Sequence, residues 1–133
     1  MNKQAAEITR LCPCGTGGTY EACCQPCHLG TPAPNAEALM RSRYTAYVLG
    51  LEDYLLKTWH PDTRPARLDL ANDAETRWLG LQVKSFQQTG EATATVSFVA
   101  RYKIAGKAHR LSELSSFVRV TGQWLYVDGV IEQ

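Results

Sequence analysis

Residues 92–104 read ATATVSFVARYKI and carry an apolar side chain at every second position. A period of two places these side chains on one face of an extended chain, so the segment predicts a β-strand with one face in a hydrophobic core. Gly90 and Gly106 bound the segment, and Gly122 follows at the same interval of sixteen residues. Glycines equally spaced between alternating segments mark turns, so this half of the chain predicts three hairpins.

The three hairpins join four long antiparallel strands. These strands are predicted at residues 79–88, 92–104, 108–120 and 123–130. The third strand loses its two-residue period between Leu114 and Phe117, which predicts a β-bulge. Since a bulge bends the sheet, the sequence predicts a curved four-stranded meander.

Helical periodicity marks residues 36–49. Apolar residues recur there at helical spacing, Asn35 is a typical N-cap, and Gly50 is a typical stop. The segment therefore predicts an amphipathic helix that faces the core. Arg41 and Arg43 flank its polar side, where we expect a solvated face or ion pairs.

Two further helices are expected before the sheet. Residues 51–59 repeat the helical pattern until Pro61 interrupts it, and residues 68–77 form a weaker segment with Asp73 as a cap. Helices followed by an antiparallel meander are typical of an α+β fold in which the helices pack on one face of the sheet. We expect a cone with the helices on its concave face and a cavity inside.

All five cysteines of the chain lie between residues 11 and 28. Cys12 and Cys14 are one residue apart, and Cys23 and Cys24 are adjacent. Zinc takes four thiolate or imidazole ligands in a tetrahedral shell, and two cysteine pairs on either side of a glycine-rich loop can supply them. We therefore expect these four cysteines to bind one Zn²⁺ ion in a small knuckle.

Other interpretations of the cysteine segment stay open. Cys27 and His28 are spare donors, and His28 could replace Cys24 as the fourth ligand. Cys24 and Cys27 also have the spacing of a redox pair, but adjacent cysteines rarely form an unstrained disulfide and no βαβ pattern stands beside them. The third interpretation is that the cysteines bind no metal. Their zinc-like spacing argues against it.

Two short motifs in this segment carry a resemblance. They are Cys-Pro-Cys-Gly-Thr-Gly at residues 12–17 and Tyr-Glu-Ala-Cys-Cys at residues 20–24. Together they resemble the SEC-C motif, a zinc-binding knuckle also found at the C-terminus of the SecA translocation motor. The resemblance implies the same four zinc ligands.

Five segments of the remaining chain carry a second resemblance. They are Leu-Met-Arg-Ser-Arg-Tyr-Thr-Ala-Tyr at residues 39–47, Tyr-Leu-Leu-Lys-Thr-Trp-His-Pro at 54–61, Trp-Leu-Gly-Leu at 78–81, Phe-Val-Ala-Arg-Tyr at 98–102 and Trp-Leu-Tyr-Val-Asp-Gly at 124–129. They resemble the YchJ-like family of bacterial proteins, in which a SEC-C knuckle precedes a domain of the nuclear transport factor 2 fold. The resemblance implies a cystatin-like cone, with the knuckle at residues 1–30 and the α+β domain at residues 31–133.

Charge and hydropathy argue against several classes of partner. Only 20% of the residues are charged and the formal net charge is +1, so the chain has no basic field to gather nucleic acid. No apolar run approaches the roughly 18 residues that span a membrane, and the first ten residues lack a secretory core. We expect a cytoplasmic protein. Its zinc knuckle would dock a protein partner, and its larger domain would serve as a scaffold that can also form a homodimer.

The interior of the cone is the alternative place for a function. Cone folds of this class can hold a small molecule, and several are dehydratases or isomerases. The candidate cavity residues are Tyr44, Tyr54, Trp59, His60, His109, Glu113, Trp124 and Asp128. Because no nucleophile, base and oxyanion donor can be assembled from them, we assign no catalytic residue and favour a non-enzymatic role. A small-molecule-binding protein or an enzyme that uses the cavity is the alternative.

Overall fold

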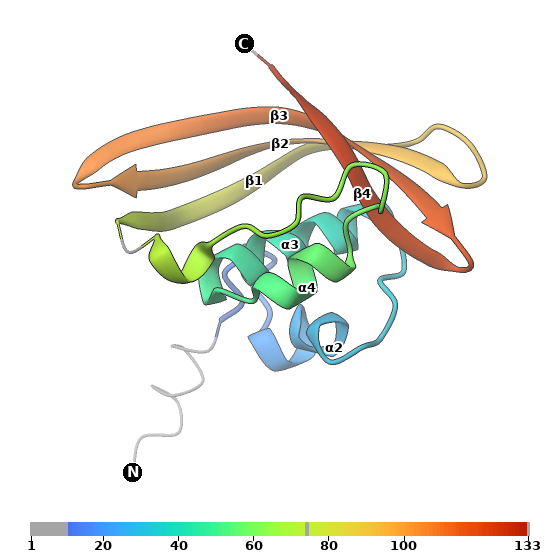
Figure 1. Cartoon of the computed structure of the whole chain (residues 1–133), viewed down its shortest axis with the longest axis horizontal. Coiled ribbons are helices and arrows are strands. Elements are labelled where there is room, and N and C mark those ends of the chain that lie inside the picture. Colours follow the sequence, from blue (N-terminus) through green and yellow to red (C-terminus); the bar gives the residue numbers. More distant parts are fainter. Residues whose placement is uncertain (1–10, 74, 133) are drawn as a thin grey trace.

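The computed structural model describes residues 11–73 and 75–132. Its elements, in chain order, are η1 (Tyr20–Ala22), α2 (Gln25–His28), α3 (Ala36–Leu49), α4 (Glu52–Lys57), η2 (Leu70–Asn72), β1 (Thr76–Gln88), β2 (Thr93–Ile104), β3 (Lys107–Val120) and β4 (Gln123–Ile131). The four strands form one curved antiparallel sheet in the order β1-β2-β3-β4, with the helices before it (Figure 1). The predicted α+β fold is confirmed.

Two of the three hairpin turns are two-residue turns with both residues at positive φ. Ala105 and Gly106 have φ angles of 50° and 83°, and Thr121 and Gly122 have φ angles of 51° and 77°. Turns of this kind match the right-handed twist of the strands that they join, so they set the register of β2 against β3 and of β3 against β4. The first turn, between β1 and β2, is longer.

The sheet curves because its strands contain bulges. The register between β3 and β4 shifts opposite Ser116 and Phe117, but the extra residue there is Val127 of β4; β3 pairs with β2 without a shift, so the bulge predicted in the third strand lies on its neighbour. β1 has two more register shifts against β2, one after Trp78 and one after Val83. Each extra residue bends its strand, and the bent sheet wraps over α3 (Figure 1).

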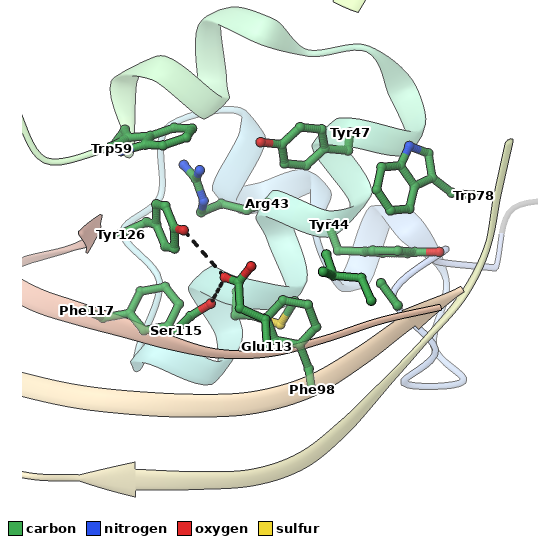
Figure 2. Close-up of a pocket in the computed structure, with 13 residues that line it drawn as sticks. Arg43, Tyr44, Tyr47, Trp59, Trp78, Phe98, Glu113, Ser115, Phe117 and Tyr126 are labelled. Carbon is green, nitrogen blue, oxygen red and sulfur yellow. Dashed lines mark hydrogen bonds between the residues drawn. The ribbon is translucent and has the colours of Figure 1, made fainter. Parts of the chain in front are cut away.

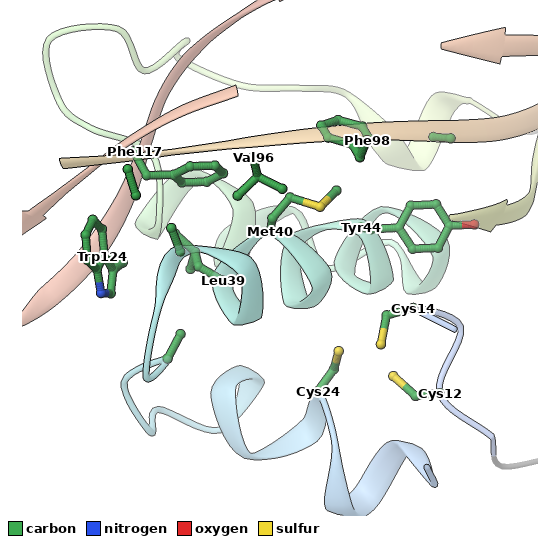
Figure 3. Close-up of a cluster of buried hydrophobic side chains, with 14 residues drawn as sticks. Cys12, Cys14, Cys24, Leu39, Met40, Tyr44, Val96, Phe98, Phe117 and Trp124 are labelled. Carbon is green, nitrogen blue, oxygen red and sulfur yellow. The ribbon is translucent and has the colours of Figure 1, made fainter. Parts of the chain in front are cut away.

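α3 lies between the sheet and the cysteine-rich segment, as Figure 3 shows. The Asn35 side chain accepts a hydrogen bond from the Ala38 N–H at 2.8 Å, and Gly50 ends the helix with a φ of 74°. Both caps agree with the sequence prediction. One continuous core joins the three layers and includes Cys12, Cys14, Cys24, Leu39, Met40, Tyr44, Val96, Phe98, Phe117 and Trp124.

The helix predicted over residues 51–59 is shorter than expected. α4 ends at Lys57, because Trp59 pairs with Tyr126 of β4 in an isolated parallel bridge. The Tyr126 N–H also donates to the carbonyl of Thr58 at 2.8 Å. The end of α4 is therefore tied to the sheet. No helix within residues 11–73 and 75–132 has both the length and the apolarity needed to cross a membrane.

The weak helix predicted over residues 68–77 is wrong. The one helical turn among the described residues of this segment is η2, and β1 already begins at Thr76, three residues earlier than predicted. Asp73, expected as a helix cap, accepts hydrogen bonds from the N–H and the hydroxyl of Thr76. Glu52 accepts two further backbone N–H groups from this segment. Carboxylates thus satisfy backbone donors of a segment that has little internal hydrogen bonding of its own.

Candidate metal centre and cavity

Residues 11–19 form a closed loop that presents the first pair of cysteines. An isolated bridge between the ends of the loop and a hydrogen bond from the Cys12 N–H to the Gly18 carbonyl, at 2.9 Å, hold it shut. Gly15 and Gly17 turn the loop with φ angles of 85° and 91°. Residues with a side chain rarely adopt such angles, so this loop depends on glycine at both positions.

The second pair of cysteines lies where η1 meets α2. Cys23 ends η1 and Cys24 precedes the first residue of α2. Thr19 caps η1 by accepting a hydrogen bond from the Ala22 N–H at 3.3 Å. Pro26 occupies the first turn of α2, where its missing N–H costs no helical hydrogen bond. The two short helices thus present the second pair opposite the first.

The structure brings the four predicted ligands together. The Sγ atoms of Cys12, Cys14, Cys23 and Cys24 all lie within 4.8 Å of one another, and those of Cys14 and Cys23 are 3.5 Å apart. A tetrahedral zinc ion with Zn–S bonds of about 2.3 Å holds its sulfur atoms about 3.8 Å apart. Cys12, Cys14 and Cys24 are buried and Cys23 is half-buried. The cluster therefore has the size, the chemistry and the shielding of a tetrathiolate metal site.

The protons of the cluster are distributed unevenly. A hydrogen bond from the Cys24 thiol lowers the pKa of Cys14 to about 4. That same hydrogen bond, followed by burial, raises the pKa of Cys24, and burial raises the pKa of Cys23 to about 11. One thiolate is therefore stabilised by its neighbours at neutral pH. A bound cation would take the place of the remaining protons.

α3 supports the cluster with two polar side chains. The Thr45 hydroxyl lies 3.6 Å from the Cys12 sulfur and donates to the Cys24 sulfur at 3.4 Å. Arg41 donates from Nη1 to the carbonyl of Cys14 at 2.7 Å. Contacts of this kind orient metal ligands from outside the coordination shell. The cysteine segment is thus held against α3 by polar bonds as well as by packing.

The two alternative ligands lie outside the sulfur cluster. Cys27 is half-buried in α2. His28 is hydrogen-bonded through Nδ1 to the Tyr20 hydroxyl at 2.7 Å and through Nε2 to the Ser42 carbonyl at 2.8 Å. Its ring also contacts Tyr54 edge-on, with the centroids 4.7 Å apart. Both ring nitrogens are therefore engaged, and His28 fastens α2 to α3.

His28→Ala is expected to lower the free energy of unfolding by about 2 kcal/mol and to leave the metal content unchanged. The substitution removes two hydrogen bonds, each worth about 0.5–1.5 kcal/mol, and a ring contact. Chemical denaturation followed by tryptophan fluorescence measures the first effect, and metal analysis measures the second. Cys27→Ser is the control, with an expected change below about 1 kcal/mol. Loss of metal from His28→Ala would instead identify the histidine as a ligand.

A cavity of about 260 Å³ lies between α3 and the concave face of the sheet (Figure 2). Most of its wall is aromatic or aliphatic, and the wall includes one guanidinium and one carboxylate. The residues that carry its chemistry are Arg43, Tyr47, Trp59, Glu113, Ser115 and Tyr126.

Arg43 is buried in the wall of this cavity, with 6% of its surface exposed. Its Nη1 donates to the Leu55 carbonyl and to the Thr58 hydroxyl, both at 2.7 Å. The guanidinium carbon lies 5.0 Å from the ring centre of Trp59 and 4.7 Å from that of Tyr126, so two cation–π contacts hold it. Burial lowers the pKa of Arg43 to about 10, which leaves the side chain charged at neutral pH.

The prediction of a solvated face or an ion pair is wrong for Arg43. Arg41 does form an ion pair, with 3.1 Å between its Nε and Oε2 of Glu37. Arg43, two residues later, lies on a different face of α3, and α4 and β4 cover that face. Within residues 11–73 and 75–132, no carboxylate oxygen comes within 4.0 Å of the Arg43 nitrogens. Carbonyl, hydroxyl and aromatic groups therefore hold this buried charge.

Glu113 reaches the cavity from β3. Its Oε2 accepts hydrogen bonds from the Ser115 hydroxyl at 2.6 Å and from the Tyr126 hydroxyl at 3.4 Å (Figure 2). Gly129 of β4 pairs with Ser115, and a Cβ atom at this glycine would overlap the Glu113 carboxylate. The carboxylate can therefore lie flat against β4 only because residue 129 has no side chain.

The predicted cavity residues divide into two groups. The structure places Tyr44, Trp59 and Glu113 on the cavity wall. His109 stacks instead on a tyrosine of β2, with the ring centres 5.3 Å apart, and Trp124 is 4% exposed in the core. Neither lines this cavity: His109 shares a face of β3 with Glu113 but lies farther along the strand, and Trp124 of β4 is packed in the core. Tyr54, His60 and Asp128 also lie outside this cavity wall.

Comparison with protein families matches two segments of the chain. Residues 10–26 match the SEC-C motif, and residues 35–129 match the model described as YchJ, middle NTF2-like domain. The chain belongs to the YchJ family. The two matched segments correspond to the sulfur cluster and to the sheet with its helices.

Curated relatives of this YchJ-family chain are similar over nearly its whole length. A UPF0225 protein of Bordetella parapertussis is 55% identical over 132 residues, which cover 97% of this chain and 98% of that protein. A UPF0225 protein of Cupriavidus pinatubonensis is 57% identical over 125 residues, which cover 89% of this chain and 86% of that protein.

Two solved structures of SEC-C motif containing proteins are also similar. The solution structure from Rhodopseudomonas palustris is 34% identical, has a TM-score of 0.81, and covers 92% of this chain and 98% of that chain. The crystal structure from Psychrobacter arcticus is 31% identical, has a TM-score of 0.76, and covers 92% of this chain and 82% of that chain. Both are therefore similar in fold to this chain over most of its length.

The sequence of this YchJ-family chain did not lead to a prediction of the polar residues in the cavity wall. The missed residues are Arg43, Tyr47, Ser115 and Tyr126. A usable signal was present in α3, where Ser42, Arg43 and Thr45 stand among apolar residues and leave no continuous polar face. A helix without such a face is covered on more than one side, so its polar residues must find partners inside the protein.

Proposed function

We propose that this chain is a zinc-binding protein in which the ion has a structural role. Cys12, Cys14, Cys23 and Cys24 supply the complete tetrahedral shell, and the ion fastens the knuckle to α3. The observation that carries the proposal is the convergence of four sulfur atoms within 4.8 Å of one another. Since one family motif covers all four cysteines, the site also matches the SEC-C resemblance.

The donor set favours zinc over other metals. Calcium and magnesium bind oxygen ligands, whereas a tetrahedral set of four thiolates suits zinc or iron–sulfur chemistry. The 3.5 Å separation between the Cys14 and Cys23 sulfurs fits ligands that share one ion. A cluster of several iron atoms would hold its cysteines farther apart.

A closed sulfur shell supports a structural role for the ion. Catalytic zinc sites keep one coordination position open and need a general base nearby. Among the described residues, no histidine or carboxylate joins the four cysteines. We therefore assign the zinc no part in a reaction.

The position of the knuckle explains why such an ion would matter to the whole chain. The knuckle packs on the side of α3 opposite the sheet, while Met40 and Tyr44 of the same helix face the sheet (Figure 3). Residues 11–28 are too few to form a core of their own, so coordination bonds would supply the order that packing cannot. The zinc site thus acts as a scaffold for the helix that forms one wall of the cavity.

Metal analysis of protein purified without chelator tests the proposal. We expect one zinc ion per chain, and we expect Co²⁺ in its place to show the visible absorption of a tetrahedral tetrathiolate site. Cys23→Ser is expected to lose both signals. Cys27→Ser is expected to keep them, because Cys27 lies four residues after Cys23 and outside the cluster. Protein that carries no metal, or equal loss in both variants, would contradict the proposal. The protein partner and the homodimer stay predictions.

A further inference from the structure

We propose that the cavity between α3 and the sheet binds a small zwitterion with an apolar side chain, which is the chemistry of an aromatic amino acid. Its carboxylate would bind Arg43 and its ammonium group would bind Glu113. This inference goes beyond the zinc site and does not depend on it.

The first argument is the unmatched charge of Arg43. This guanidinium is 6% exposed and yet has no carboxylate oxygen of the described residues within 4.0 Å. Only its Nη1 donates to the described part of the protein, to a carbonyl and a hydroxyl. Nε and Nη2 are not among the fully enclosed donors without a partner, and Arg43 lines the cavity. A buried cation with free donors is best satisfied by a carboxylate.

The second argument is the unused half of the Glu113 carboxylate. Both hydroxyls that bind this group, from Ser115 and Tyr126, donate to Oε2. Oε1 accepts no hydrogen bond from the described residues. Figure 2 shows the Glu113 carboxylate pointing into the space between β3 and α3, on the side where Arg43 lies. An ammonium group is the strong donor that this oxygen lacks.

The two charges are held apart, and this separation favours a ligand with two opposite charges. Arg43 is fixed by α4 and by two aromatic rings, and Glu113 is fixed by two hydroxyls and by the space above Gly129. Among the described residues no ion pair of 4.0 Å or less joins the two side chains, although Glu113 lies near enough to raise the pKa of Arg43 against the larger effect of burial. A ligand with only a carboxylate could pair with Arg43 but would leave the charge of Glu113 without a partner. A zwitterion pairs with both groups.

The shape of the cavity sets the rest of the ligand. Its volume of about 260 Å³ lies just below the range of about 300–1,000 Å³ that is usual for drug-sized ligands, so the ligand is small. Tyr44, Trp78 and Phe98 form an aromatic part of the wall. Aromatic side chains pack well against such rings, in offset or edge-on contacts.

Binding of three related probes to the whole chain, as purified without chelator, tests this proposal. L-phenylalanine has both charges, 3-phenylpropionate lacks the ammonium group, and 2-phenylethylamine lacks the carboxylate. Isothermal titration is expected to show that phenylalanine binds at least about tenfold more tightly than either of the others, because each charged hydrogen bond contributes about this factor. Amide chemical-shift changes should fall on residues around the cavity.

Two variants separate a binding role of the carboxylate from a structural one. Glu113→Gln keeps the shape of the side chain and is expected to lower phenylalanine affinity about tenfold while leaving that for 3-phenylpropionate unchanged or higher. Glu91→Gln, on the exposed turn before β2, is the control and should change neither affinity. Equal affinity for phenylalanine and 3-phenylpropionate, no binding of phenylalanine at millimolar concentration, or shift changes away from the cavity would each overturn the proposal.

Discussion

Cys14→Ser is expected to release the metal and to lower the free energy of unfolding by about 4 kcal/mol or more. Cys14 is fully buried, and its sulfur contacts that of Cys23 at 3.5 Å. A serine hydroxyl is a weak zinc ligand, so the buried sulfurs of Cys12 and Cys24 and the half-buried sulfur of Cys23 would be left without their cation. The knuckle shares one core with α3 and the sheet, and its loosening therefore weakens the whole chain.

Denaturant unfolding with and without a chelator measures this effect. The chelator should bring the unmodified chain to the stability of Cys14→Ser and should leave the variant unchanged. Cys27→Ser replaces a half-buried cysteine outside the cluster and is the matched control. A Cys14→Ser protein that keeps both its zinc and its stability would refute a structural metal centre.

Arg43→Ala is expected to lower the free energy of unfolding by about 3 kcal/mol. The substitution removes two hydrogen bonds of 2.7 Å to the end of α4 and two cation–π contacts, and it leaves a void in a buried wall. The Leu55 carbonyl loses the Arg43 Nη1 donor. The tie between α3, α4 and β4 is therefore expected to loosen.

Urea denaturation of two arginine variants checks this prediction. Arg119→Ala is the matched control, because the Arg119 guanidinium also lies over an aromatic ring, at 5.8 Å from Trp124, but belongs to an exposed side chain. Its expected cost is below about 1 kcal/mol. Similar losses for both variants would show that the buried bonds of Arg43 add nothing to stability.

The sheet could be predicted because its signals are local. The two-residue period of residues 92–104 and the glycines at 106 and 122 act within each hairpin, whereas the bulge expected in β3 between Leu114 and Phe117 lies opposite it, at Val127 of β4. The helix predicted over residues 68–77 was wrong because a contact distant in the sequence helps to set the path of this segment. Its path is set by the Glu52 and Asp73 carboxylates, and Glu52 lies on α4, distant in the sequence.

The cysteine cluster was also predictable, because close spacing limits what the chain can do. Two cysteine pairs joined by a short glycine-rich loop can meet with few backbone choices, and the structure brings the same four sulfurs together. The choice against His28 was not local. Tyr20 and the Ser42 carbonyl of α3 occupy its two nitrogens.

The sequence alone determines which segments form strands, where the hairpins turn and which four sulfurs can meet, because period, glycine conformation and spacing act over a few residues. Tertiary packing alone makes Arg43 a buried cation beside a cavity, since the sheet and the knuckle cover α3 on opposite sides and α4 closes over the arginine. It also separates Glu113, on the cavity wall, from His109 on the same strand face. Burial and neighbours depend on elements far apart in the chain, and no local pattern records them.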